Sequence, residues 1–126
     1  MYRSVALCLL LCSSVLGHEM TPTYAEWQVS HIEGIKKTTM KMFNKREEIK
    51  WYEIGIFDEE WNPIPFVLHS KTYKLIEIAY LGHEKFDVYI AAKDSNRTEY
   101  ICSTSKLSGD SNSKPMISSK ICSRFK

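Results

Sequence analysis

Two cysteines near the C-terminus, Cys102 and Cys122, carry the clearest chemical signal in the sequence. The other two cysteines, Cys8 and Cys12, lie in an apolar N-terminal stretch with the pattern of an export signal. An even pair of cysteines in an oxidising compartment is expected to form a disulfide. A pair about 20 residues apart, with no histidine near either member, lacks the ligand spacing of a zinc site. We therefore expect a disulfide between Cys102 and Cys122, and no metal bound by them.

His18 is the one histidine with a distinct chemical possibility, because removal of the preceding segment makes it the N-terminal residue. An N-terminal histidine offers an amine and an imidazole together, a combination that chelates copper. The other histidines, His31, His69 and His83, are scattered along the chain and are expected at the surface. A small copper-binding protein that uses His18 is therefore one hypothesis, although the sequence as a whole predicts no cofactor.

Patterns of catalytic sites are missing from the sequence. There is no nucleophile elbow, glycine-rich phosphate loop, HExxH or paired-carboxylate pattern, and the chain has only 5 glycines with which to build one. An acidic run at 58–60 stands beside Trp61, but its spacing lacks the alternating oxygen ligands of a calcium loop. We expect the protein not to be an enzyme.

The charge balance narrows the class of partner. The chain carries 17 basic and 15 acidic residues, a net charge of +2, which argues against a nucleic-acid binder. The N-terminal apolar run at 5–11 is far shorter than the ~20 residues needed to cross a bilayer, so no membrane span is expected. A protein partner remains the favoured class.

Residues 1–17 have the pattern of a signal peptide. Arg3 supplies the positive start, 5–11 the apolar centre, and Gly17 the last of the small residues that precede the cleavage point. Cleavage after Gly17 predicts a periplasmic or secreted protein. The remaining segment, 18–126, is roughly 110 residues long, enough for one domain with one core.

Short β-branched and aromatic runs separated by turn residues dominate this segment, and no part shows a sustained helical period with caps. Pro63 and Pro65 keep the extended piece at 64–68 out of any central strand. Seven short strands in about a hundred residues are typical of an immunoglobulin-like β-sandwich, which is the all-β fold we expect. The expected strands cover 21–29, 35–43, 49–57, 72–81, 86–91, 97–106 and 116–125.

The expected disulfide also predicts a register. If the last two strands are antiparallel neighbours and Cys102 faces Cys122, then Ile101 lies opposite Ser123, Ser103 opposite Ile121, and Tyr100 opposite Arg124. Both cysteines then share one sheet face, and the apolar residues of the two strands share the other. Those apolar residues are Ile101, Ile117, Ile121 and Phe125. A disulfide between the two sheets is the alternative, which the sequence leaves open.

The order of these features resembles the N-terminal immunoglobulin-like domain of the periplasmic pilus chaperones. The opening strand carries a Thr-x-x-x-aromatic pattern that ends at Trp27, and the second strand ends at Asn44 before its turn. The resemblance runs from Met20 to Lys126 and lies in order and spacing. Its matching segments are 23–27, 38–44, 51–57, 61–64, 99–102 and 118–126.

The resemblance implies binding of another protein by edge-strand pairing. Chaperones of this family lend their last strand to an incomplete subunit, so that backbone hydrogen bonds supply affinity and alternate side chains supply fit. Here the partner-binding set would be Ile117, Ile121 and Phe125, with Lys126 at the end of the strand. The alternative is that the three apolar side chains face the core of this protein itself.

Two departures from the family affect the expected activity. Tyr24 stands where the family has a subunit-anchoring arginine, so that only Lys126 matches the anchoring pair. The family also has a second domain, and the given sequence stops where that domain would begin, so the carboxylate-anchoring mechanism is not expected here. The leading hypothesis is an exported, non-enzymatic protein-binding domain, with partner and oligomeric state unspecified. A structural or adhesive module of a larger extracellular or particle assembly is the competing one.

Overall fold

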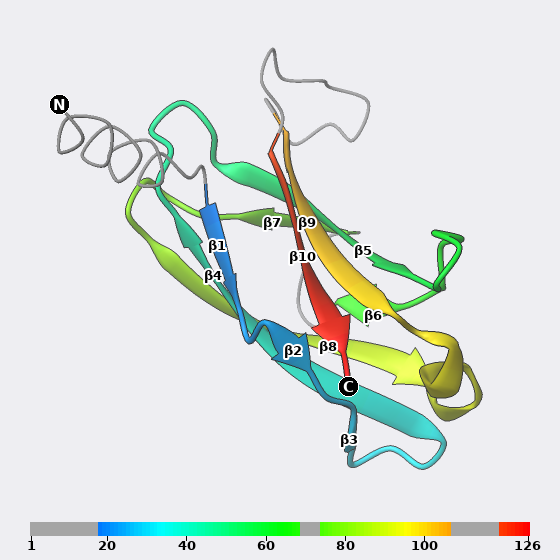
Figure 1. The fold of residues 1–126 in the computed structure, drawn as a ribbon. Helices are drawn as coiled ribbons and strands as arrows, with labels where there is room; N and C mark the ends of the chain where they lie inside the picture. The colour runs from blue at the N-terminus through cyan, green and yellow to red at the C-terminus, as the bar shows by residue number, and fades with distance from the viewer. Residues whose placement is uncertain (1–17, 69–73, 107–118) are drawn as a thin grey trace, which may run out of the picture.

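The computed structural model describes residues 18–68, 74–106 and 119–126, which form two packed β-sheets (Figure 1). The expected signal peptide and Ile117 lie outside the described residues. The first sheet has the order β1-β4-β8-β6, with β3 also paired to β4, and the second has the order β2-β10-β9-β5-β7. The first sheet consists of β1 (His18–Thr21), β3 (Gln28–Val29), β4 (Ile35–Asn44), β6 (Val67–Leu68) and β8 (His83–Ala91). The second consists of β2 (Tyr24–Ala25), β5 (Trp51–Phe57), β7 (Leu75–Glu77), β9 (Tyr100–Lys106) and β10 (Lys120–Phe125).

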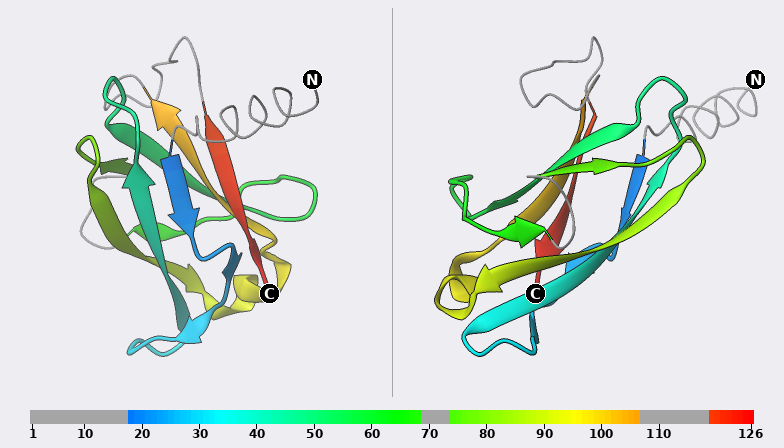
Figure 2. Two further views of the ribbon diagram at one scale, coloured as in Figure 1. Left: turned by 60° about the vertical axis from the view of Figure 1, so that its left-hand side comes forward. Right: turned by 180° about the vertical axis from the view of Figure 1, so that it is seen from behind.

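The expected all-β sandwich is confirmed, and Figure 2 shows its two layers from two further sides. The described residues form ten strands rather than about seven. The expected strand at 21–29 is divided into β1, β2 and β3, and the extended piece after Pro65 contributes the short β6. As Pro63 and Pro65 predict, β6 lies at the edge of its sheet. Within the described residues, no helix is long and apolar enough to cross a membrane.

The division of the first expected strand sends the chain from one sheet to the other. β1 runs antiparallel to β4, whereas β2 runs parallel to β10 in the opposite sheet. The break falls at Pro22, whose peptide bond with Thr21 is cis. Proline has no backbone N–H to donate to a ladder, so a strand cannot continue through it in a central position. β1 and β10 thus form neighbouring edges of the two layers.

Inward side chains alternate along the long strands as the sequence predicts. Met40 and Met42 are buried, whereas Lys41 between them is exposed. The same alternation buries Tyr52, Ile54 and Ile56 on β5, and Phe86, Val88 and Ile90 on β8. These side chains form one continuous core between the sheets. At about 25 cal/mol per Å² of buried apolar surface, this core is the main stabilising contribution.

Several strand boundaries differ from expectation, and β8, for example, begins at His83 rather than at 86. Residues Ala92–Arg97 form a 3-10 helix, so the strand expected from Arg97 begins only at Tyr100. Ser95 and Thr98 bury their hydroxyls there, because each donates to the carbonyl three residues earlier. The strand expected at 72–81 is reduced to Leu75–Glu77 among the described residues. Side-chain to backbone hydrogen bonds such as those of Ser95 and Thr98 compete with strand pairing, which explains the later start of β9.

Candidate functional site

The strand β10 has one fully paired side and one largely open side. Toward β9 it is paired from Lys120 to Arg124. Toward β2 the pairing is limited to Arg124 and Phe125, supported by hydrogen bonds from Arg124 N to Thr23 O and from Lys126 N to Ala25 O, each 2.9 Å. Among the described residues no strand pairs with 120–123 on that side. In Figure 1 this stretch of β10 runs alongside β1, which belongs to the other sheet.

The disulfide lies within one sheet. Cys102 of β9 and Cys122 of β10 are directly opposite each other, and their sulfur atoms are bonded. The expected register is confirmed, since Ile101 faces Ser123, Ser103 faces Ile121 and Tyr100 faces Arg124. Cross-links of this type suit a non-hydrogen-bonded pair, where the two Cα atoms are closest. The bond therefore fixes the alignment of the strand whose other side is open.

The inward side chains of β10 take part in the core of the protein itself. Phe125 is 8% exposed and stacks on Trp27, with ring centroids 4.7 Å apart. Ile121 is half-buried and packs against the core. Ser123 is buried and donates a hydrogen bond to Pro22 O at 2.6 Å. For Phe125 the structure favours the alternative stated above, a core position, whereas Ile121 is partly accessible.

His18 is also an interior residue. Its side chain is fully buried, with Nε2 2.8 Å from Ser103 Oγ and Nδ1 3.0 Å from Ser119 Oγ. Its ring contacts that of Tyr52 at 4.6 Å. Burial lowers the pKa of His18 from 6.5 to about 4, and the nearby positive charge of Arg46 adds to the effect. Both ring nitrogens are thus engaged by hydroxyl groups, which leaves neither free for the copper site considered above.

A stack of aromatic and basic side chains lies on the outward face of the sheet beside the open edge. The rings of Trp61 and Tyr100 are parallel within 2°, with centroids 4.2 Å apart, and Phe57 lies against Trp61. Lys120 Nζ lies 4.9 Å from the centroid of Trp61, at a distance typical of cation–π contacts. A Cβ atom on Gly55 would lie 2.8 Å from two ring atoms of Phe57, so glycine at this position makes room for the ring.

Trp61 is held in an unusual backbone conformation. Its φ angle is 66°, in the left-handed region that costs a non-glycine residue roughly 1 kcal/mol or more. The turn that holds it is built on Asp58, whose carboxylate accepts hydrogen bonds from the N–H groups of Glu60 and Asn62 at 2.9 Å. These bonds lower the pKa of Asp58. The acidic run at 58–60 therefore shapes a turn, and Trp61 remains 47% exposed.

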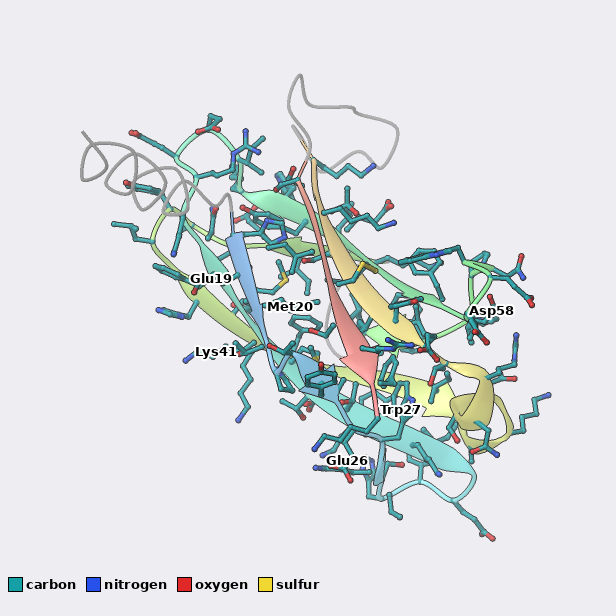
Figure 3. The ribbon with its side chains drawn as sticks, in the orientation of Figure 1. Glu19, Met20, Glu26, Trp27, Lys41 and Asp58 are labelled. Carbon is teal, nitrogen blue, oxygen red and sulfur yellow. A yellow bond between two sulfur atoms is a disulfide. The ribbon has the colours of Figure 1, made fainter. Side chains whose placement is uncertain are left out.

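The end of β10 carries charges that are locally matched. Arg124 donates to Glu99 at 2.6 Å, and Lys126 lies 3.7 Å from Glu26. Tyr24, at the position where the resemblance would place an arginine, is exposed and lies beside Arg124 in the register. Lys126 therefore has an acidic neighbour in place of an arginine companion. Figure 3 shows Glu26 and Trp27 close to the C-terminal end of β10.

Sequence reasoning missed the His18 cluster and the aromatic stack. The sequence suggests His18 as an N-terminal ligand, yet His18 and Met20 are the buried positions of a short strand in which Glu19 between them is exposed. That alternation was a usable signal. The stack combines Phe57 of β5, Trp61 of the following turn and Tyr100 of β9, so no local sequence pattern predicts it. No group of three or more histidine, cysteine or acidic residues in the described segments is placed to hold a metal ion.

Comparisons with known proteins give a match at the level of fold. No protein-family model and no curated protein matches the sequence. A structure of the SafA pilin of Salmonella enterica with the SafB chaperone matches with a TM-score of 0.61 and 10% identity, over 89% of this chain and 54% of that chain. The Escherichia coli chaperone DraB matches with a TM-score of 0.62 and 13% identity, over 86% of this chain and 52% of that chain.

The chain therefore has the immunoglobulin-like fold of pilus chaperones, as the resemblance in its sequence indicates. It spans about half of the length of the chains that it matches. At identities this low, the likeness describes the fold alone.

Proposed function

We propose that this chain is an exported, non-enzymatic protein-binding domain that captures an extended segment of a partner along the open side of β10. The observation that carries the proposal is the absence of a strand partner for 120–123 on that side, among the described residues. An unpaired edge is a template for an added strand. The likeness to chaperones, one of them solved with a pilin, supports the same conclusion.

The backbone geometry of β10 indicates which groups a partner would contact. Successive residues of a strand direct their N–H and C=O groups to alternate sides. Arg124 N bonds to Thr23, on the side of β2, whereas Phe125 N bonds to Glu99, on the side of β9. By this alternation the backbone groups of Lys120 and Cys122 face the open side. A partner strand would pair with these two residues.

Side chains on the same strand supply the fit. Ile121 offers a half-buried apolar side chain toward the space between the sheets, whereas the side chain of Lys120 lies against Trp61 on the outward face and contributes only its backbone to the edge. Because Phe125 and Ser123 are buried, the specificity of the edge rests on the N-terminal half of β10. Ile117 belongs to the same proposed set and lies outside the described residues.

The test uses proline as a block of the open side. Lys120→Pro removes the N–H that faces the open side of β10 and keeps the pairing of β10 with β9. Proline is tolerated at a strand edge. Lys120→Ala is the matched control, because it removes the same side chain and keeps the N–H. Exported protein is isolated from its native compartment, and co-purifying proteins are identified and quantified by mass spectrometry. Thermal unfolding of both variants verifies that they fold.

We expect a partner that co-purifies with the wild type and with Lys120→Ala, and that is lost with Lys120→Pro. Ile121→Lys should weaken capture as well, because it places a charge where the fit is apolar. Equal capture by the proline and alanine variants would show that the edge is not the binding site.

One observation favours the competing hypothesis of an adhesive or structural module. Trp61 is both exposed and held in a costly conformation, and such residues cluster at functional sites. Trp61→Ala separates the two functions. This substitution should leave capture of a partner segment at the β10 edge intact. If the aromatic stack is the contact surface of an adhesive module, the same substitution should abolish binding to the larger assembly.

A further inference from the structure

Basic side chains line a hollow on the sheet that contains β1, β4 and β8. It has a volume of about 500 Å³ and lies over β4 and β8, next to the point where β1 ends. Its lining includes Thr21, Pro22, Thr39, Lys41, His83 and Lys85. The charged members of this lining are both lysines, and both are exposed. A hollow of this size is in the range of small-molecule sites.

The hollow exists because the edge of the sheet is interrupted there. β1 pairs with β4 as far as Thr21, opposite Lys41, and β3 resumes the pairing at Lys37. Between these two points the chain crosses to the other sheet as β2. Figure 3 shows Lys41 on the side of the sandwich formed by β1 and β4. The residues of β4 at 38–40 therefore have no strand beside them on this edge, within the described part of the chain.

The two lysines of the hollow have no ion-pair partner among the described residues. Lys41 and Lys85 are directly opposite each other on β4 and β8. Like charges in such positions destabilise a sheet. Neither ammonium group forms an ion pair with a described residue, although the carboxylate of Asp87 lies on the same face of β8, two residues from Lys85. Asp87 accepts a hydrogen bond from Thr39 Oγ1, and Glu19 is paired with Lys45 at 2.7 Å.

We propose that this hollow binds an anionic group of the phosphate or sulfate class, held between Lys41 and Lys85. Directly opposite residues have Cβ atoms roughly 5 Å apart, so two flexible lysine side chains can converge on one anion. The hydroxyl of Thr21 and the ring of His83 supply further donors at the rim. His83 is held in place by stacking on Phe43, with ring centroids 4.4 Å apart. The site is independent of the edge of β10, which belongs to the other sheet.

The first experiment measures the effect of inorganic phosphate on thermal unfolding of the exported protein, with chloride at equal ionic strength as reference. Phosphate should raise the Tm of the wild type more than chloride does. Lys41→Gln and Lys85→Gln should each weaken phosphate binding about ten-fold, the equivalent of one charge-assisted hydrogen bond. Lys37→Gln is the matched control, since it removes a charge from the same strand and face but outside the hollow.

The same variants give a second readout without any ligand. Removing one of two opposed lysines relieves their repulsion, so Lys41→Gln and Lys85→Gln should raise the Tm in chloride by about 1–5 °C. Lys37→Gln should leave it unchanged. A variant that fails to fold would be visible in this measurement, and Lys85→Gln then tests the site in place of Lys41→Gln.

The second experiment separates a free anion from a lipid headgroup. Co-sedimentation is measured with vesicles of phosphatidylglycerol and with vesicles of phosphatidylcholine. Binding of phosphate alone supports a free anion. Binding of phosphatidylglycerol vesicles that depends on Lys41 and Lys85 supports a headgroup. The proposal would be overturned if neither probe bound, or if neither Lys41→Gln nor Lys85→Gln changed the binding.

Discussion

His18 Nε2 lies 2.8 Å from Ser103 Oγ, although 85 residues separate them in the sequence. The contact joins β1 in one sheet to β9 in the other, and Ser119, next to the start of β10, contacts the opposite ring nitrogen. A neutral imidazole donates with one nitrogen and accepts with the other, which suits two hydroxyl partners. The cluster therefore ties the two layers together at the end where the open edge of β10 begins.

This burial predicts a loss of stability in mild acid. The pKa of His18 is about 4 in the folded state and 6.5 when the residue is exposed, so the unfolded chain binds the proton first. Stability is therefore intact above pH 6.5 and falls as the pH drops toward 4, by about 3 kcal/mol. Urea unfolding at pH 7 and at pH 4 measures the difference. His18→Gln should reduce this pH dependence, whereas replacement of the exposed His31 should not.

Substitution of Asn44, at the end of β4, is predicted to cause a large loss of folding stability. Asn44 is fully buried, and its Nδ2 donates to Ile49 O at 2.7 Å and to Ile78 O at 2.9 Å. Its Oδ1 accepts from the hydroxyl of Tyr52, whose pKa burial raises to about 12. Asn44→Ala leaves several buried polar groups unpaired and should cost about 3 kcal/mol in urea unfolding.

Tyr52→Phe is the comparison for this change. It removes one hydroxyl and leaves Asn44 bonded to the two carbonyls, so it should cost about 1 kcal/mol. If the two variants lose the same amount of stability, the side-chain amide of Asn44 does not have the role that these three hydrogen bonds indicate.

The disulfide should stabilise the domain substantially. Cys102 and Cys122 are 20 residues apart, and closing a loop of that length contributes about 3 kcal/mol by restricting the unfolded chain. The double variant with alanine at both positions should show this loss in urea unfolding. Reductant should destabilise the wild type and leave the double variant unaffected. A wild type indifferent to reductant would mean that the bond does not constrain the unfolded state.

Processing of the N-terminus is a further prediction. We expect cleavage after Gly17, so that the exported protein begins at His18. N-terminal sequencing or intact mass of the protein recovered from the medium or periplasm measures this directly. Gly17→Leu should impair cleavage, because signal cleavage needs small residues at its site. Recovery of the uncleaved chain as the main exported form would contradict the assignment.

Several parts of the fold could be predicted because they depend on local information. Side chains in a strand point alternately to opposite faces, so the pattern Met40, Lys41, Met42 already separates inside from outside. The register of β9 and β10 followed from one assumed pair, because a single fixed contact between antiparallel strands determines all the others. The prolines at 63 and 65 likewise placed β6 at an edge.

Other parts of the fold could not be predicted, because they depend on which strands come together in the assembled sandwich. The stretch at 21–29 has strand composition throughout, yet it contributes to both sheets, because β1, β2 and β3 each pair where an edge is available. Only the assembled sandwich decides which backbone edges remain unpaired. The open side of β10 and the hollow beside Lys41 both result from that choice.

By itself, the sequence determined the long strands, their inward faces and the pairing of Cys102 with Cys122, since these follow from alternation and from counting cysteines. The tertiary structure alone decided that His18 is buried, that Phe125 belongs to the core and that Trp61 stacks on Tyr100. Those contacts join residues 34 or more positions apart. Their energies depend on packing and desolvation, which arise only when both layers are in place.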